Sequence, residues 1–238
     1  MQRYSVVLLI NAKVNQHSIL SERFSMKTLK VKITFTEEVL GTASPSKEIH
    51  AEYIASKAPD KLTREEEVEA IGIEEVVEKA MTIFPRDKDS NPIFWDYQWK
   101  GFFKDTCAAL MRCEGFETYK ASKSESGKGK KGELRAYKKV IDGCIFVHPR
   151  MIAIKVKGKM GNCQRPLRGN TAQGERIALA NSETVPAGST CELEIQCLSD
   201  SHEKFVREWL DYGQLRGIGQ WRNSGKGRFT VNYLKDKQ

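Results

Sequence analysis

The sequence predicts an α+β fold in which helices cover one face of an antiparallel sheet. Strand-like and helix-like patterns occur in mixed order: a strand, helices, several strands, a helix, a glycine-rich stretch and a last strand. This order lacks the regular alternation of strand and helix that a parallel sheet requires. Hydrophobic residues make up 39% of the 238 residues, which is enough to build a core.

The first half of the chain predicts one strand followed by helices. Residues 29–35 alternate apolar and polar side chains with a period of two, which indicates a half-buried strand. Residues 47–80 predict helices, and a capping box at residues 63–66 opens an acidic one. Residues 94–112 carry an apolar stripe at helical spacing and predict a further helix.

The second half predicts most of the sheet. Residues 122–132 are rich in Lys, Ser and Gly, which is typical of a mobile loop. Residues 201–212 predict a helix that stops at Gly213. Strands are predicted at residues 144–147, 151–156, 176–179, 191–197 and 229–233.

We expect residues 26–238 to form one domain, with a helical insertion at about 47–112 and a mobile basic loop at about 120–135. Residues 1–25 are expected to be an N-terminal extension. Their apolar run, Val6–Ile10, is too short to span a membrane, and no small-residue cleavage pattern follows it.

No metal or cofactor is expected. None of the six cysteines lies in a C-x-x-C pair and the four histidines are scattered, so zinc-finger spacing is absent and a reduced, cytoplasmic protein is indicated. Residues 127–132 match G-x-G-x-x-G, but they follow no strand and open no helix, which excludes a dinucleotide site. Residues 219–226 resemble a P-loop with the wrong spacing, and Gly227 replaces its Ser or Thr, which excludes an NTPase.

The net charge of +8 favours an anionic partner, and the charge is unevenly placed. Residues 60–80 hold eight acids and three bases, whereas residues 120–139 hold eight bases and two acids and residues 147–176 hold seven bases and one acid. This distribution predicts an oriented site for a polyanion, although an ordinary solvated surface accounts equally well for any single run.

The stretch from Gly217 to Phe229 is the strongest functional signal. It has four glycines in its first eleven residues, with basic side chains between and after them. Glycines expose the backbone, and together with cationic side chains they suit contacts with phosphate or sugar. The alternative is a flexible surface hairpin, against which the large aromatic Trp221 argues.

Candidates for catalysis are few. His148 precedes Pro149 and Arg150, where an acid or base for RNA cleavage would sit, and a surface or turn histidine is the alternative. Asp87, Asp89 and Asp96 are candidate ligands of a divalent cation, but turn formation accounts for the first two.

Three segments together resemble the RAMP superfamily, the RRM-derived proteins that form the crRNA-binding backbone of CRISPR effector complexes. The first is the glycine-rich stretch. The second is Arg86–Lys104, in which a turn and an apolar run lead to Lys-Gly at the start of a helix. The third is Arg165–Arg168, continued through Arg176 to residues 185–193. The resemblance covers roughly residues 26–233, and the whole chain also resembles proteins carried by bacterial prophages.

The resemblance implies a ferredoxin-like/RRM-type antiparallel sheet with an inserted helical segment and a C-terminal glycine-rich loop. It also implies that Lys100 and Gly101 approach a nucleic-acid backbone beside that loop. Two departures favour binding over catalysis. Gln98 stands where the family has Ser, and the acid used for target cleavage has no counterpart nearer than Asp96.

We therefore expect a non-catalytic protein of phage or prophage origin that binds single-stranded nucleic acid, RNA more than DNA, in the bacterial host cytoplasm. The tryptophans Trp99 and Trp221 either stack on bases or belong to the core. The expected nucleic-acid contacts are Lys100, Gly101, Lys104, Arg165, Arg168, Gly217, Gly219, Trp221, Arg222, Gly225, Lys226, Gly227 and Arg228.

Two other functions stay open. One is a metal-independent endoribonuclease in which His148 is the acid or base and Lys155 or Arg150 stabilises the phosphorane. The other is an anti-defence protein that imitates or blocks a host CRISPR effector subunit through its acidic residues 60–80. Head-to-tail contacts would give a homo-oligomer or filament, and no membrane partner is expected.

Overall fold

A computed structural model describes residues 26–44, 81–123, 133–171 and 174–234 of the chain. The expected N-terminal extension, the helices expected within residues 47–80 and the centre of the basic loop at 120–135 lie outside these residues. Among the described helices, none has the length and apolar character needed to cross a membrane.

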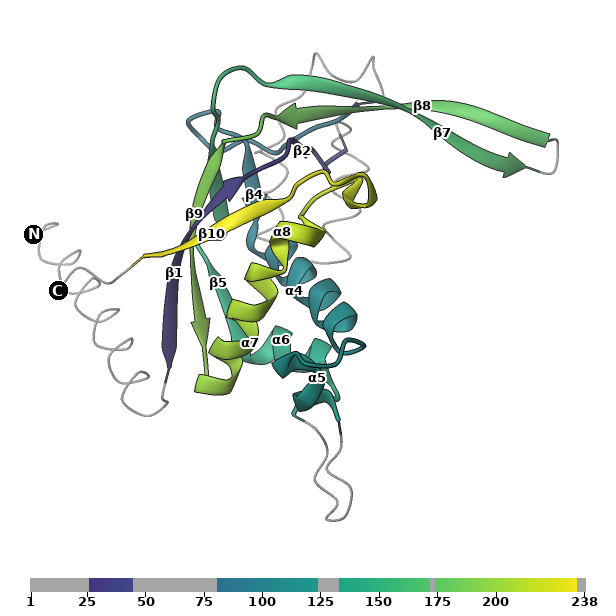
Figure 1. Ribbon diagram of the computed structural model, residues 1–238. Helices are drawn as coiled ribbons and strands as arrows, with labels where there is room; N and C mark the ends of the chain where they lie inside the picture. The colour runs from purple at the N-terminus through teal and green to yellow at the C-terminus, as the bar shows by residue number, and fades with distance from the viewer. Residues whose placement is uncertain (1–25, 45–80, 124–132, 172–173, 235–238) are drawn as a thin grey trace, which may run out of the picture.

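The centre of the molecule is an antiparallel sheet with strand order β10-β1-β9-β6-β4, and β5 pairs with β9 beside β6 (Figure 1). All of its pairings are antiparallel. The strands are β1 (Lys27–Phe35), β4 (Ile93–Trp95), β5 (Ile145–His148), β6 (Met151–Lys155), β9 (Thr190–Cys197) and β10 (Phe229–Leu234).

Along the chain the central elements follow the order strand, helix, strand, strand, helix, strand. The first helix is α4 (Asp96–Leu110) and the second is α7 (Asp200–Asp211). In the sheet, β1 lies between β10 and β9. The strands β5 and β6, which follow each other in the chain, both lie on the other side of β9. This is the ferredoxin-like arrangement, so the predicted α+β fold with its ferredoxin-like sheet is confirmed.

The core lies between this sheet and the helices α4 and α7. Alternate side chains of β1, from Leu29 to Phe35, are buried, as the period of two predicts. Trp99 of α4 is 0% exposed, and its ring centroid lies 5.5 Å from that of Phe229 in β10. The hypothesis that Trp99 stacks on a base is therefore wrong, because the ring is enclosed in the core.

The helical segment after α7 continues further than predicted. A short helix, α8 (Gly213–Arg216), follows directly, so Gly213 does not end the helical run. A Cβ at Gly213 would lie 2.2 Å from the Phe229 ring. Glycine is therefore required there by close packing, and the helical run ends at Gly217, whose φ is 71°. The other described helices are α5 (Glu117–Ser122), α6 (Tyr137–Cys144) and the 3-10 turn η2 (Arg222–Ser224).

A second sheet lies beside the first and carries a long hairpin. Its order is β2-β8-β3, with β7 paired to β8. Figure 1 shows the β7–β8 hairpin extending away from the body of the molecule. The sequence predicted only four residues of it, because β7 contains Gly, Asn and Pro and has no alternation. The strands are β2 (Val39–Leu40), β3 (Met81–Thr82), β7 (Gly161–Thr171) and β8 (Gly174–Val185).

Candidate nucleic-acid interface

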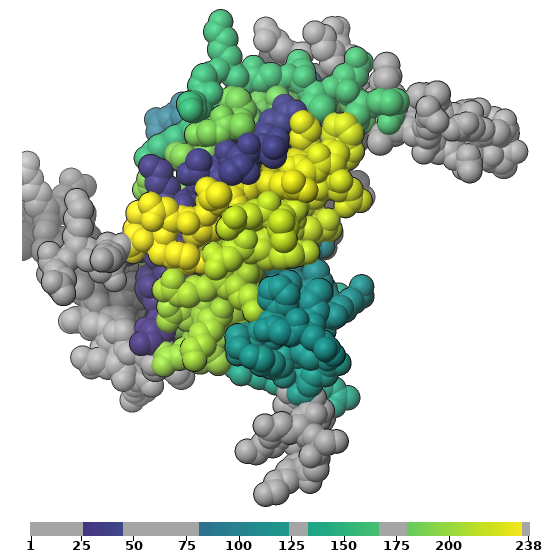
Figure 2. All heavy atoms as spheres, in the orientation of Figure 1, coloured from purple at the N-terminus to yellow at the C-terminus, as the bar shows by residue number. Residues whose placement is uncertain are grey.

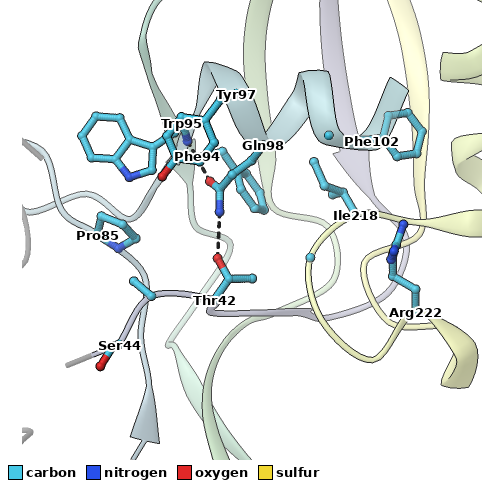
Figure 3. A pocket seen from close by; sticks show the side chains of 13 residues that line it. Thr42, Ser44, Pro85, Phe94, Trp95, Tyr97, Gln98, Phe102, Ile218 and Arg222 are labelled. Carbon is cyan, nitrogen blue, oxygen red and sulfur yellow. Dashed lines mark hydrogen bonds between the residues drawn. The ribbon is translucent and has the colours of Figure 1, made fainter. Parts of the chain in front are cut away.

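The glycine-rich loop, Gly217–Arg228, lies against the first turns of α4. A pocket of about 530 Å³ opens between them. Figure 3 shows Trp95 and Tyr97 at one end of the pocket and Ile218 and Arg222 at the other. The lining residues are Thr42, Ala43, Ser44, Pro85, Phe94, Trp95, Tyr97, Gln98, Gly101, Phe102, Ile218, Gly219 and Arg222.

Two glycines close the loop on itself. Gly217 and Gly227 have φ values of 71° and 72°, in the left-handed region. A Cβ at Gly227 would lie 1.8 Å from the carbonyl oxygen of Ile218, and the Ile218 N–H donates to the Gly227 carbonyl at 2.9 Å. These glycines are therefore fixed by the folding of the loop, whatever it binds.

Gln220 anchors the loop to the second sheet. Its side-chain amide donates to the Gly41 carbonyl at 2.7 Å and to Thr82 Oγ1 at 3.2 Å. Its amide oxygen accepts a hydrogen bond of 2.9 Å from Arg165 of β7. The loop is thus bonded to β3, to β7 and to the residue after β2, which contradicts the alternative of a flexible surface hairpin.

Trp221 is the exposed aromatic residue of the loop. It is 41% exposed and adopts the left-handed conformation with φ of 53°, which is rare for a bulky residue. The Arg165 guanidinium lies 5.2 Å from the centre of its ring. Figure 2 shows the C-terminal segment, in yellow, as a continuous exposed strip beside the purple N-terminal strands.

Two cations of the loop are already paired. Arg222 donates to Asp105 of α4 at 2.7 Å, and Lys226 pairs with Glu38. Each reaches back to an acid on a neighbouring element, and the expected contact of both with phosphates stays a prediction. Arg228 is exposed and donates to the Leu215 carbonyl at 3.1 Å. Because a carbonyl carries no net charge, this bond does not neutralise the guanidinium group.

Asp105 accepts hydrogen bonds from two arginines, Arg216 at 2.8 Å and Arg222 at 2.7 Å. Burial alone would raise the pKa of this carboxyl group. The hydrogen bonds and charges of the two guanidinium groups outweigh it and hold the pKa of Asp105 below its ordinary value. Arg216 and Arg222 carry two positive charges and Asp105 carries one negative charge, so this cluster has a net charge of +1 beside the pocket.

The lysine–glycine pair is divided between two sides of α4. Gly101 lines the pocket, whereas Lys100 donates to the Asp142 carbonyl at 3.3 Å and lies 5.1 Å over the Phe146 ring. Lys104 pairs with the Asp142 carboxylate at 2.5 Å. Successive residues of a helix point about 100° apart, so Lys100 and Lys104 face α6 and β5. Burial lowers the pKa of Lys100.

Gly101 differs from the loop glycines. Apart from its chain neighbours and the backbone of its own helix, no described residue has an atom within 4 Å of the position that its Cβ would occupy, and its φ is not positive. A glycine inside a helix costs about 0.5–1 kcal/mol relative to alanine. No described residue explains this glycine by close contact, so the bare backbone is left accessible on the pocket side of α4.

The remaining predicted contacts lie on the hairpin and in the loop. Arg165 is near the base of the hairpin and is part of the Gln220–Trp221 contact. Arg168 lies further out on β7, where its backbone pairs with Ile177. Gly219 lines the pocket, and Gly225 ends the turn η2 with φ of 85°.

The structure gives the catalytic candidates other partners. Asp96 accepts a hydrogen bond of 2.9 Å from Arg150, and Lys155 lies 3.5 Å from Glu192. His148 is exposed at the end of β5, where its backbone pairs with Glu194. Asp96 and Arg150 thus pair with each other, Lys155 lies in an exposed ion pair, and the catalytic roles stay predictions.

Asp87 has a turn-forming role. Its carboxylate accepts hydrogen bonds from the backbone N–H groups of Asp89 and Asn91, at 3.0 and 2.7 Å. Within the described part of the chain, no group of three or more His, Cys, Asp or Glu side chains is placed to hold a metal ion.

No protein-family model matches the chain, and no curated protein matches it. Among solved structures it is similar to a chain of the type III-B Cmr-beta bound to cognate target RNA, with 11% identity and a TM-score of 0.47. That match covers 95% of this chain and 66% of the other, so this chain spans just under two thirds of its length.

Two further matches have comparable values. A chain of a type IV-B CRISPR complex is 10% identical with a TM-score of 0.46, covering 89% of this chain and 92% of that one. Cmr6 from Pyrococcus furiosus is 10% identical with a TM-score of 0.45, covering 87% and 99%. At these identities the similarity concerns the fold alone, so the function is argued from the geometry of the pocket and loop.

Proposed function

We propose that this chain binds single-stranded nucleic acid without cleaving it. The binding surface is the loop–helix surface, defined as Gly217–Arg228 together with the face of α4 that carries Gln98, Gly101 and Asp105. The preference for RNA over DNA rests on the resemblance of the sequence to the RAMP superfamily. The observation that carries the proposal is the accessible backbone at Gly101, which faces an exposed cationic loop.

The accessible glycine supports binding of a chain-like ligand. A strand that contacts a protein through its sugar and phosphate groups must approach the backbone closely, and a side chain at Gly101 would occupy that space. The helix bears the cost of this glycine with no compensating contact from the described residues.

Trp221 and Arg165 support contact with unpaired bases. The exposed part of the Trp221 ring offers a stacking surface, which contributes about 1–3 kcal/mol per base in single-strand binding proteins. Arg165 holds the ring in place. A double-stranded ligand would hide the faces of its bases from such a ring, so a single strand fits better.

The positive charge of the loop–helix surface supports a moderate electrostatic contribution to the binding of nucleic acid. Arg228, Arg165 and the surplus charge at Asp105 amount to about three positive charges at the loop–helix surface. Each neutralised phosphate of a single strand lowers the slope of log K against log[salt] by about 0.7, so we expect a slope of about −2.

The test uses two helical glycines. Gly101 and Gly143 both lie in helices, and at neither position does a described residue outside the local helix backbone come within 4 Å of a Cβ. Gly143 lies in α6, away from the loop (Figure 1). Binding of a fluorescent single-stranded RNA is measured by anisotropy at low salt. We expect Gly101→Leu to weaken binding at least about tenfold and Gly143→Leu to leave it unchanged.

Two results would contradict the proposal. One is failure of the unmodified protein to bind single-stranded RNA or DNA of mixed sequence. The other is equal binding by the Gly101→Leu variant and the unmodified protein. Recovery of shortened RNA after incubation would show instead that the protein is a nuclease.

A further inference from the structure

The indole N–H of Trp95 is a buried donor without a partner. Trp95 is 1% exposed and lines the pocket, yet its Nε1 makes no hydrogen bond with any residue in the described part of the chain. Buried indole N–H groups normally find an acceptor, as Trp209 does with Thr118 Oγ1 at 2.9 Å. Trp99 also lacks a partner, but it is enclosed in the core and does not line the pocket.

The position of the Trp95 ring is fixed by its neighbours. Tyr97 stacks on it with a centroid distance of 6.4 Å and an angle of 11°, and the Arg150 guanidinium lies 5.6 Å from its centroid. Figure 3 shows the indole nitrogen on the edge of the ring that faces Pro85, another residue of the pocket lining. Trp95 therefore directs its buried N–H edge toward Pro85 at the wall of the pocket, and its faces are used for packing.

The other polar groups at this end of the pocket also offer hydrogens. Gln98 accepts from the Trp95 backbone N–H at 2.8 Å through its oxygen and donates one of its two amide hydrogens to Thr42 Oγ1 at 2.7 Å. Because the Thr42 hydroxyl accepts this bond, its own hydrogen is available to donate. A ligand that satisfies these groups must carry acceptors.

The rest of the lining is apolar, with a cation at the far end. Phe94, Phe102 and Ile218 supply apolar walls, and Arg222 lies at the end opposite Trp95 (Figure 3). A volume of about 530 Å³ is within the usual range for small-ligand sites. A flat heterocycle with carbonyl oxygens, joined to an anionic group, matches this distribution of donors, apolar walls and charge.

We propose that the pocket binds one unstacked nucleotide of the bound strand, whose base presents a carbonyl oxygen to Trp95 Nε1–H and whose phosphate lies toward Arg222. This inference rests on the proposed function. Uracil, guanine and cytosine carry ring carbonyls that fit the donors, whereas adenine has none and its amino group would oppose them. The pocket thereby reads the chemical type of a single base.

The test is a nuclear magnetic resonance titration of the ¹⁵N-labelled full chain with uridine 5′-monophosphate. Each of the four tryptophans gives one indole N–H signal. The signal that disappears in Trp95→Phe identifies Trp95, or sequential assignment does so if that variant fails to fold. We expect the Trp95 signal to move downfield with uridine 5′-monophosphate and to stay fixed with ribose 5-phosphate, which lacks the base.

Affinity provides a second measurement. The Trp95→Phe variant keeps an aromatic ring but loses the donor, so its affinity for uridine 5′-monophosphate should fall about fivefold to tenfold. Gly101→Leu places a side chain on the pocket side of α4 and should abolish the shift of the Trp95 signal while keeping the helix. Gly143→Leu should leave that shift intact.

The outcomes separate this inference from the proposed function. If single-stranded RNA binds while the Trp95 signal stays fixed with both RNA and nucleotide, the inference is wrong and the proposed function stands. If neither ligand binds, the proposed function is wrong and the inference fails with it. A shift of equal size with ribose 5-phosphate would show a phosphate site and would overturn the assignment of a base.

Discussion

Arg222 of the glycine-rich loop donates a 2.7 Å hydrogen bond to Asp105 of α4, although 117 residues separate them in the sequence. Arg216, directly before the loop, donates to the same carboxylate at 2.8 Å. One acid thus fixes the start and the middle of the loop against the helix face that carries Gly101. The loop and the helix form a single surface because of this shared carboxylate.

Gly101→Ala should separate stability from binding. Alanine is favoured over glycine inside a helix, and nothing lies within 4 Å of the new Cβ, so the free energy of unfolding should rise by about 0.5–1 kcal/mol. RNA affinity should fall, because the methyl group narrows the approach to the backbone. Urea denaturation and anisotropy measure the two effects. Gly143→Ala is the matched control: its RNA affinity should not change, and a parallel loss in both variants would refute the role of Gly101.

Asp105→Asn should weaken the attachment of the loop. Asp105 is about 31% exposed, and the loss of its charge-assisted hydrogen bonds should lower the free energy of unfolding by about 1–2 kcal/mol at neutral pH. Asp142→Asn, which breaks the more exposed pair with Lys104, should cost less than about 1 kcal/mol.

The same variant should show a distinct pH dependence. The pKa of Asp105 is lower in the folded chain than in the unfolded chain. Its stabilising effect is therefore complete above the unfolded pKa of about 3.9 and is lost as pH falls through the folded pKa. The difference in unfolding free energy between the unmodified protein and Asp105→Asn should shrink below about pH 4. A difference that stays constant down to pH 2 would contradict the ion pairs.

Trp221→Gly should lower RNA affinity by about fivefold to a hundredfold, the cost of one lost stacking contact. Glycine adopts the left-handed conformation of residue 221 without strain, so the fold should be retained. Anisotropy measures the affinity and thermal unfolding checks the fold. Phe116→Gly is the comparison, since Phe116 is also an exposed aromatic residue but precedes α5. Unchanged affinity of Trp221→Gly would exclude stacking at this ring.

The salt dependence of binding should distinguish Arg228 from Lys100. Arg228 is exposed in the loop, so Arg228→Ala should make the slope of log K against log[salt] less steep by about 0.7. Lys100 faces α6, so Lys100→Ala should leave the slope unchanged. The sequence alone treats the two residues alike. An equal effect of both substitutions would show that the strand follows the opposite side of α4.

Periodicity accounts for the parts of the fold that were predicted. The alternation in residues 29–35 and 191–197 and the helical stripes in residues 94–112 and 201–212 reflect burial against the single core, which leaves its pattern in the local sequence. The β7–β8 hairpin was predicted only in part. Its first strand extends from the body, and none of the side chains described in it, at residues 161–166, is buried, so no buried face imposes alternation there.

The pocket could not be predicted from spacing. The sequence indicated the loop and Gly101, but Trp95 and Thr42 carried no signal, because their role depends on elements far apart in the chain meeting at one place. A single signal was available in retrospect: Gln98, two residues before the Lys100-Gly101 pair, provides the amide that links Trp95 to Thr42.

The sequence by itself determined the main strands and helices of the central sheet, the glycine-rich loop and the excess of positive charge, since each follows from a local residue pattern. The tertiary structure alone decided that Trp99 is enclosed while Trp221 is exposed, that Lys100 turns away from the loop, and that Asp105 and Glu38 neutralise loop cations. These are properties of residues brought together by packing, and a charge or ring has no partner until distant elements meet.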